Sequence, residues 1–219
     1  MVEISTSILS VNRSQSAKTF YKLEEAHTEY FHIDVMDGEF VDQNNLELMK
    51  EYSNILKQIS NLPLDIHLMV KNIKKHINEY IPLYPNIITF HIEAIDNKKQ
   101  VLDLIGYIKE NGIKAGISIK PNTKIEEILE YLPYVHMVLI MTVEPGYGGQ
   151  ELIPSTIDKV RQMKEYIDDN NIDLDIEVDG GINLDNSQQL KQAGANILVV
   201  GTSIITSNDY SQTINKFKE

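Results

Sequence analysis

Four side chains in this sequence carry groups that bind divalent cations and move protons. His32 and Asp34 lie two residues apart in the segment HIDVMDG, His67 lies between apolar residues, and Asp179 precedes two glycines. In an extended strand, the spacing of His32 and Asp34 directs both side chains to the same side. Taken singly, His67 could be a hydrogen-bonded core residue and Asp179 a turn residue. Buried together without a cation, the carboxylates would be desolvated and would repel each other, so the four residues together predict a metal site.

The chemistry of these side chains limits the metal. They offer nitrogen and oxygen but no sulfur, and the chain contains no cysteine. Mixed nitrogen and oxygen ligands suit zinc, iron, manganese and cobalt. We therefore expect one divalent ion of this group, and the sequence does not choose among them.

Glycine-bearing turns predict a second feature, a site for phosphate. They follow three late apolar runs, at residues 146–149 (GYGG), 180–181 (GG) and 201–203 (GTS). Backbone N–H groups can approach an anion closely where the residue lacks a Cβ atom. The two arginines, Arg13 and Arg161, lie elsewhere in the chain. We therefore expect backbone amides to hold the phosphate, which also explains how an acidic protein could bind an anion.

The remaining histidines and three methionines are more ambiguous. Met36, Met69 and Met141 lie at or just beyond predicted strand ends, where they could fill the core or line a site for a reactive anion. His91 also ends a predicted strand, and both a structural role and a role behind the metal ligands stay open. The other three are expected at the surface or at helix edges: His27, His76 and His136.

Alternating elements must position these residues. Short apolar runs predict eight strands, and stretches with helical spacing separate most of them. The predicted strands are Val2–Ile8, Tyr30–Val35, Leu64–Met69, Ile87–His91, Lys114–Ile119, Met137–Met141, Asp173–Val178 and Ile197–Val200. The predicted helices are Ser14–His27, Leu46–Ile59, Lys74–Tyr80, Asn97–Glu110, Ile125–Tyr131, Ser155–Asn170, Asn186–Ala193 and Asn208–Lys218.

This order of elements favours a TIM (β/α)8 barrel. Several strands are continuous Val, Ile and Leu runs, as in a parallel sheet buried on both faces. An open doubly wound sheet would usually carry a glycine fingerprint after its first strand, and none follows Ile8. In a TIM barrel the active site lies at the C-terminal ends of the strands. That end is where the predicted metal and phosphate residues occur.

The composition excludes several classes of protein. The chain has 219 residues, 42% of them hydrophobic, and we expect a single domain over residues 1–219. The net charge of −12 argues against nucleic acid or an anionic membrane as a partner. The absence of cysteine excludes disulfides and thiolate catalysis. No run of about 18 apolar residues occurs, and we expect a cytoplasmic protein.

Five segments resemble the ribulose-phosphate 3-epimerase family, in the family's order and over nearly the whole chain. They are residues 7–10 (SILS), 32–38 (HIDVMDG), 65–70 (DIHLMV), 144–150 (EPGYGGQ) and 177–181 (EVDGG). The resemblance implies a metal-dependent TIM barrel that interconverts ribulose 5-phosphate and xylulose 5-phosphate. It also implies that the third carbon is inverted through an enediolate. Because the family commonly assembles as dimers or hexamers, we expect a homo-oligomer.

The resemblance further implies individual roles. It makes His32, Asp34, His67 and Asp179 the metal ligands, with Asp34 and Asp179 also the acid/base pair. It places Ser7 and His67 against the substrate. The remaining implied residues are Gly146, Tyr147, Gly148, Gly149, Gly180, Gly181, Gly201 and Thr202 around the phosphate, and Met36, Met69 and Met141 along the intermediate.

Three other functions remain open from the sequence. A related epimerase acts on allulose 6-phosphate. The segment Asp42–Asn45 replaces a Pro-Asn stretch that commonly follows residues 32–38 in the family, so the choice between the two substrates stays open. A non-catalytic barrel could bind a sugar phosphate as a sensor. Such a barrel would tolerate loss of a carboxylate, so the presence of all four proposed ligands argues against it. A metal-dependent decarboxylase of keto sugar acids would need a basic residue near the substrate carboxylate. Lys120 is the candidate, but it precedes Pro121 and better fits a turn.

Overall fold

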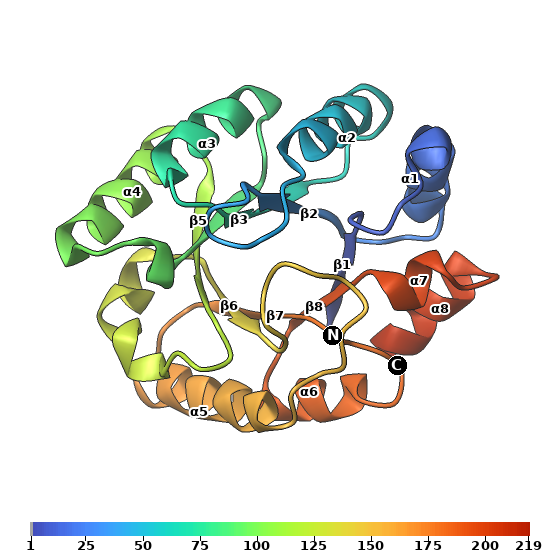
Figure 1. The fold of residues 1–219 in the computed structure, drawn as a ribbon. Helices are drawn as coiled ribbons and strands as arrows, with labels where there is room; N and C mark the ends of the chain where they lie inside the picture. The colour runs from blue at the N-terminus through green and yellow to red at the C-terminus, as the bar shows by residue number, and fades with distance from the viewer. Residues whose placement is uncertain (1) are drawn as a thin grey trace.

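Eight parallel strands close into a barrel in the order in which they occur in the chain. The computed structural model describes residues 2–219, so Met1 lies outside it. The strands are β1 Glu3–Ser7, β2 Tyr30–Met36, β3 Leu64–Met69, β4 Ile87–His91, β5 Lys114–Ile119, β6 Met137–Met141, β7 Asp175–Asp179 and β8 Ile197–Val200. The predicted TIM barrel is therefore confirmed, and Figure 1 shows the helices as a ring outside the strands.

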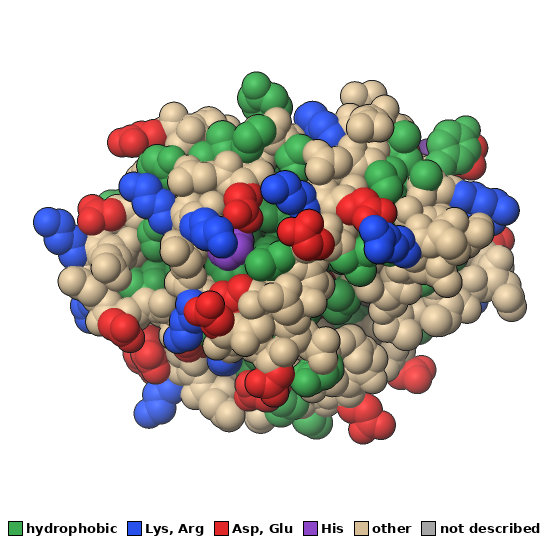
Figure 2. Space-filling model, turned by 45° about the horizontal axis from the view of Figure 1, so that its top comes forward, with side chains coloured by type: hydrophobic (Ala, Val, Ile, Leu, Met, Phe, Trp, Pro, Cys, Tyr) green, Lys and Arg blue, Asp and Glu red, His purple; other side chains and the backbone are tan. Residues whose placement is uncertain are grey.

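The helices cover the barrel with their apolar faces. They are α1 Ser16–Glu25, α2 Leu46–Ile59, α3 Ile73–Tyr80, α4 Lys98–Glu110, α5 Ser155–Asp169, α6 Ser187–Ala193, α7 Thr202–Ile205 and α8 Tyr210–Lys218. In α2 the buried residues Met49, Tyr52, Ser53 and Leu56 recur at helical spacing, so one face of the helix points inward. The Tyr52 ring packs edge-to-face on Phe20 of α1, with ring centroids 5.4 Å apart. On the outer surface, acidic and basic side chains are interspersed over the face that Figure 2 shows.

Each strand alternates between the helix layer and the barrel interior. In β2, Phe31, Ile33 and Val35 belong to the main hydrophobic core, and the residues between them point into the barrel. The interior is apolar at its N-terminal end, where Ile87, Met137 and Ile197 pack together from alternate strands. Above this layer the interior becomes polar, and the buried polar residues there include His32, Asp34 and His67.

Several predicted elements differ in detail from the structure. The predicted helix Ile125–Tyr131 is wrong: the chain forms two 3-10 segments, Ile125–Glu127 and Leu129–Tyr134, and the second contains Pro133. The ring of a proline clashes with the carbonyl four residues earlier in an α-helix, so the chain around Pro133 cannot continue as a regular one. The predicted strand Asp173–Val178 begins and ends later in the structure, as Asp175–Asp179. It continues to Asp179 because this residue still pairs with Met141 of β6.

Two further differences concern the helices. The first predicted helix begins as a 3-10 turn at Arg13–Gln15 before α1 starts. The short helix α7 was not predicted from the sequence. Within residues 2–219, none of the helices combines the length and the apolar character that crossing a membrane requires.

Candidate metal centre and sugar-phosphate pocket

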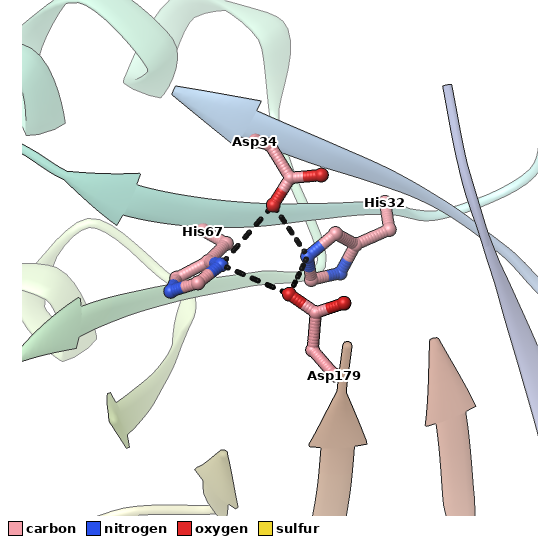
Figure 3. Close-up of side chains that lie close together, drawn as sticks. All are labelled: His32, Asp34, His67 and Asp179. Carbon is pink, nitrogen blue, oxygen red and sulfur yellow. Dashed lines mark hydrogen bonds and ion pairs between the residues drawn. The ribbon is translucent and has the colours of Figure 1, made fainter. Parts of the chain in front are cut away.

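Three strands bring the four predicted metal ligands together at the C-terminal end of the barrel (Figure 3). Asp34 and His67 occupy the same register position in the neighbouring strands β2 and β3. His67 Nδ1 lies 3.2 Å from Asp34 Oδ1 and 3.8 Å from Asp179 Oδ2. His32 Nε2 lies 3.3 Å and 4.0 Å from the same two oxygens. Two nitrogens and two oxygens therefore surround one point.

These separations fit a divalent cation. Ligands bonded at about 2.0–2.1 Å to a tetrahedral metal ion lie about 3.3–3.4 Å apart. The four contacts between imidazole and carboxylate, at 3.2–4.0 Å, are close to this value. In addition, the buried His32 Nε2 has no hydrogen-bond partner among the residues described. A buried nitrogen without a partner is costly unless a ligand satisfies it, so the residues present fit a metal ion.

The electrostatics of the two carboxylates differ strongly. Burial by itself would raise the pKa of Asp34, but His32 and His67 lie against this carboxylate and lower its pKa well below the usual value. Burial, followed by the nearby charge of Asp34, raises the pKa of Asp179 to about 7. Burial is also the main reason that the pKa of His67 falls to about 4. The protein thus holds two carboxyl groups with different proton affinities at one site.

A cavity of about 600 Å³ opens over the carboxylates. Asp34 and Asp179 line it, whereas His32 and His67 are fully buried behind them. Ser7 also lines the cavity, and its hydroxyl donates a hydrogen bond to Asp34 Oδ2 at 2.9 Å. The predicted methionines Met36, Met69 and Met141 also line the cavity. They give the carboxylates an apolar and polarizable surrounding.

The predicted phosphate residues line the other part of this cavity. They are Gly146, Tyr147, Gly148, Gly149, Gly180, Gly181, Gly201 and Thr202. Gly181 has a φ of +67°, and a Cβ atom there would lie 2.4 Å from Leu152 N, so only glycine fits. Gly148 differs, because an added Cβ would make only ordinary contacts with Leu9 and Ser10. Three loops thus bring backbone close to one volume.

Two buried acids beneath the centre were missed in the sequence analysis. Asp65 Oδ2 lies 2.6 Å from His32 Nδ1 and accepts a hydrogen bond from the Ser5 hydroxyl at 2.7 Å. Glu177 is fully buried, with Oε1 3.8 Å from His32 Nδ1. Burial and the charge of Asp65 raise the pKa of Glu177 well above its usual value. Each acid precedes a predicted ligand by two residues, and this strand periodicity was the signal that could have identified them.

The other histidines divide into three environments. His91 packs against the predicted metal ligand His67, with the Nε2 atoms of the two rings 3.0 Å apart. His27 is exposed and His136 is partly exposed. The prediction for His76 is wrong, because its side chain is buried and its Nδ1 lies 3.0 Å from Glu79 Oε2. His76 shares the inward face of α3 with Ile77, which explains its burial.

Comparison with known proteins identifies the family. A family model described as the ribulose-phosphate 3 epimerase family matches residues 3–205. The chain belongs to the ribulose-phosphate 3-epimerase family.

Named relatives span nearly the whole chain of this family member. Ribulose-phosphate 3-epimerase from Methanocaldococcus jannaschii is 36% identical over 100% of this chain and 91% of its own. The enzyme of the same name from Escherichia coli K12 is also 36% identical, over 98% of this chain and 94% of its own. The one from Bacillus subtilis is 33% identical, over 100% and 99%.

Solved structures with low identity show the shared fold of this epimerase family member. A 3-hexulose-6-phosphate synthase from Salmonella typhimurium matches with a TM-score of 0.68 and 13% identity, over 98% of this chain and 96% of its own. A tryptophan synthase α-subunit from Pyrococcus furiosus matches with a TM-score of 0.69 and 16% identity, over 100% and 96%. Membership of the epimerase family argues against the decarboxylase alternative. The basic residue that this alternative would need, Lys120, lies with its Nζ 4.1 Å from the centroid of the Phe40 ring.

Proposed function

We propose that this protein is a metal-dependent 3-epimerase that interconverts ribulose 5-phosphate and xylulose 5-phosphate. One observation carries the proposal: Asp34 of β2 and Asp179 of β7 converge on one cavity from separate parts of the barrel (Figure 3). Inversion of a carbon centre requires one group to remove a proton and another to deliver a proton from the opposite face. Two carboxyl groups with different proton affinities are suited to these two tasks.

The glycine loops support a phosphorylated substrate. We infer that backbone N–H groups of residues 146–149, 180–181 and 201–202 hold the phosphate. With the phosphate there, the ketose chain would extend across the cavity toward Asp34 and Asp179, which line it as well. Ser7 would contact the sugar and hold Asp34 in place through its hydrogen bond.

Proton transfer at the third carbon falls to the two aspartates. In one direction, the Asp34 carboxylate would take the proton from C3, and the protonated Asp179 carboxyl would deliver a proton to the other face. The reverse reaction exchanges these roles. Without a bound ion, the pKa of Asp179 is raised to about 7 and that of Asp34 is lowered, so the protein itself gives the two carboxyl groups different proton affinities. Met36, Met69 and Met141 would exclude water around the enediolate without offering a competing proton.

The metal site serves the same step. We infer that His32, Asp34, His67 and Asp179 hold one divalent ion, with zinc, iron, manganese and cobalt as candidates. When bound, the ion supplies positive charge that offsets the negative charge developing on the enediolate oxygens.

Four further expectations stay predictions. They are a contact between His67 and the substrate, a homo-oligomer, a cytoplasmic location and a single domain.

An epimerisation assay on two substrates tests this function. We expect kcat/KM for ribulose 5-phosphate to exceed that for allulose 6-phosphate by at least about tenfold. One additional hydroxylated carbon between ketone and phosphate changes transition-state binding by about 1–3 kcal/mol. A reversed ratio on one metal-loaded preparation would reject the pentulose assignment. Tight binding of both sugars with no turnover of either would instead support a non-catalytic barrel.

A further inference from the structure

Each imidazole of the metal centre has a second nitrogen that points away from it. For His32 this nitrogen meets the Asp65 carboxylate directly, at 2.6 Å. For His67 it meets a second imidazole, because His67 Nε2 lies 3.0 Å from His91 Nε2. The far nitrogen of His91, Nδ1, lies 3.0 Å from Glu93 Oε2. His67 is therefore the first of three residues in a chain that leads to a carboxylate.

Hydrogen-bonding rules set the direction of this chain. A metal ion on His67 Nδ1 requires the ring's proton to be on Nε2. His91 Nε2 must then accept that hydrogen bond, so the His91 proton is on Nδ1 and points to Glu93. A carboxylate is the acceptor that completes this arrangement.

A second carboxylate competes for the same proton. Asp34 Oδ1 lies 3.2 Å from His67 Nδ1, the nitrogen that would bind the metal. If the proton moved to Nδ1 to serve Asp34, the ligand lone pair would be lost and His91 would have to reverse. An acceptor at the His91 end opposes this change. The two ends of the chain therefore decide whether His67 presents a lone pair or a proton to the metal site.

Glu93 is held firmly in its place at the end of the chain. Its Oε1 accepts a hydrogen bond from the Lys120 backbone N–H at 2.6 Å and another from the Thr123 hydroxyl. Lys159 Nζ fixes the same loop by donating to the carbonyls of Lys120, at 2.9 Å, and Thr123, at 2.6 Å. Two oxygens of one carboxylate thus connect His91 to the loop after β5.

We infer that Glu93 is a positioning residue, which acts through His91 to keep His67 Nδ1 deprotonated and aimed at the metal. This inference rests on the metal site proposed above. It requires neither a particular sugar substrate nor epimerase activity. The role belongs to side chains that contact neither the metal nor the substrate cavity, and it explains a carboxylate pair, Asp65 and Glu93, behind the two imidazole ligands.

The variant Glu93→Gln tests the inference with little change in shape. An amide has only one oxygen, so it cannot accept hydrogen bonds from both the β5 loop and His91. If its oxygen faces the Lys120 N–H, its NH₂ group faces His91 and favours the reversed chain. We expect Zn²⁺ to bind about 10- to 100-fold more weakly, as for other outer partners of metal ligands. The measurement is competition with a chelator on metal-stripped protein.

Thr123→Val is the matched control. It removes the neighbouring hydrogen bond to the same carboxylate and leaves the contact between Glu93 and His91 in place. We expect its Zn²⁺ affinity to stay near that of the wild type. Equal affinity of Glu93→Gln and wild type would overturn the inference, and so would equal weakening in both variants, because that would indicate general loosening of the loop.

Nitrogen NMR of the Zn²⁺-loaded wild type provides a test that needs no variant. We expect His91 to carry its proton on Nδ1 alone and His67 to carry its proton on Nε2. A His91 proton on Nε2, or on both nitrogens, would overturn the inference. Since neither measurement uses a sugar phosphate, a protein that binds Zn²⁺ in this way but fails to epimerise would reject only the proposed function.

Discussion

Asp34 and His67 occupy paired positions in neighbouring strands, and their side chains meet with His67 Nδ1 3.2 Å from Asp34 Oδ1. Pairing of β2 with β3 therefore brings together three of the four proposed metal ligands, His32, Asp34 and His67. The fourth, Asp179, comes from β7 across the barrel. Because β7 pairs with neither β2 nor β3, the centre depends on closure of the whole barrel.

Removal of the metal is expected to abolish epimerisation. A strong chelator should eliminate activity, and a divalent ion should restore it. His32→Ala should weaken metal binding by at least about tenfold, because it removes one of four ligands. His76→Ala is the control, since His76 is buried on α3 and contacts Glu79 rather than the centre. Full activity in protein shown to be metal-free would reject the metal site.

Single replacements of the two aspartates should show that each aspartate acts on one face of the substrate. Asp34→Asn and Asp179→Asn should each lower turnover by about 100-fold or more, because each removes one proton-transfer group. In deuterated water, each variant should still exchange the C3 hydrogen of one epimer, and the two variants should act on opposite epimers. Metal content is measured in parallel because both residues are proposed ligands. Wild-type product without solvent deuterium would contradict the mechanism.

Gly148→Ala tests the phosphate loops without straining the backbone. The new Cβ would make only ordinary contacts, so the protein should fold, yet it would crowd the cavity wall. The Cβ should push the phosphate out of reach of one backbone N–H group. Loss of one hydrogen bond to a charged group costs about 1.5–3 kcal/mol, which corresponds to an increase in KM of about tenfold or more. We expect kcat to change little.

Gly106→Ala serves as the control for this substitution. Gly106 lies within α4, where an added Cβ meets nothing within 4 Å. Alanine there should leave KM unchanged and raise the free energy of unfolding by about 0.5–1 kcal/mol. An unchanged KM in Gly148→Ala as well would argue against phosphate binding at residues 146–149.

The pH dependence of stability should report on Glu93. Its hydrogen bond to His91 and the bonds from Lys120 and Thr123 overcome the effect of burial and lower its pKa from 4.5 to about 2. Because the pKa of Glu93 is lower in the folded than in the unfolded protein, its ionisation stabilises the folded state at pH values above the unfolded pKa. This contribution disappears as the pH falls from about 4.5 toward 2. Urea unfolding of metal-free protein at pH 6 and pH 3 measures it.

Comparison with Glu93→Gln isolates this contribution. The advantage of the wild type in free energy of unfolding should shrink by about 2 kcal/mol between the two pH values. An advantage that is the same at both pH values would show that ionisation of Glu93 does not stabilise the fold.

Much of the fold was predictable because local patterns and barrel geometry agree. Five strands, including Leu64–Met69 and Ile87–His91, begin and end where their apolar runs do. The helix Leu46–Ile59 also has its predicted bounds, since its inward face repeats at helical spacing. The segment after Lys124 was less predictable, because its apolar residues suit several kinds of helical turn and Pro133 excludes a regular one.

The sequence by itself determined which residues reach the site. His32, Asp34, His67 and Asp179 lie on predicted strands, and a parallel barrel brings the inward-facing residues of its strands together. Only the tertiary structure decided which nitrogen of each imidazole faces the centre, and which residues stand behind it. Asp65 meets His32, and Glu93 reaches His67 through His91. These contacts depend on ring orientation and strand register across the closed barrel, and neither is encoded in spacing along the chain.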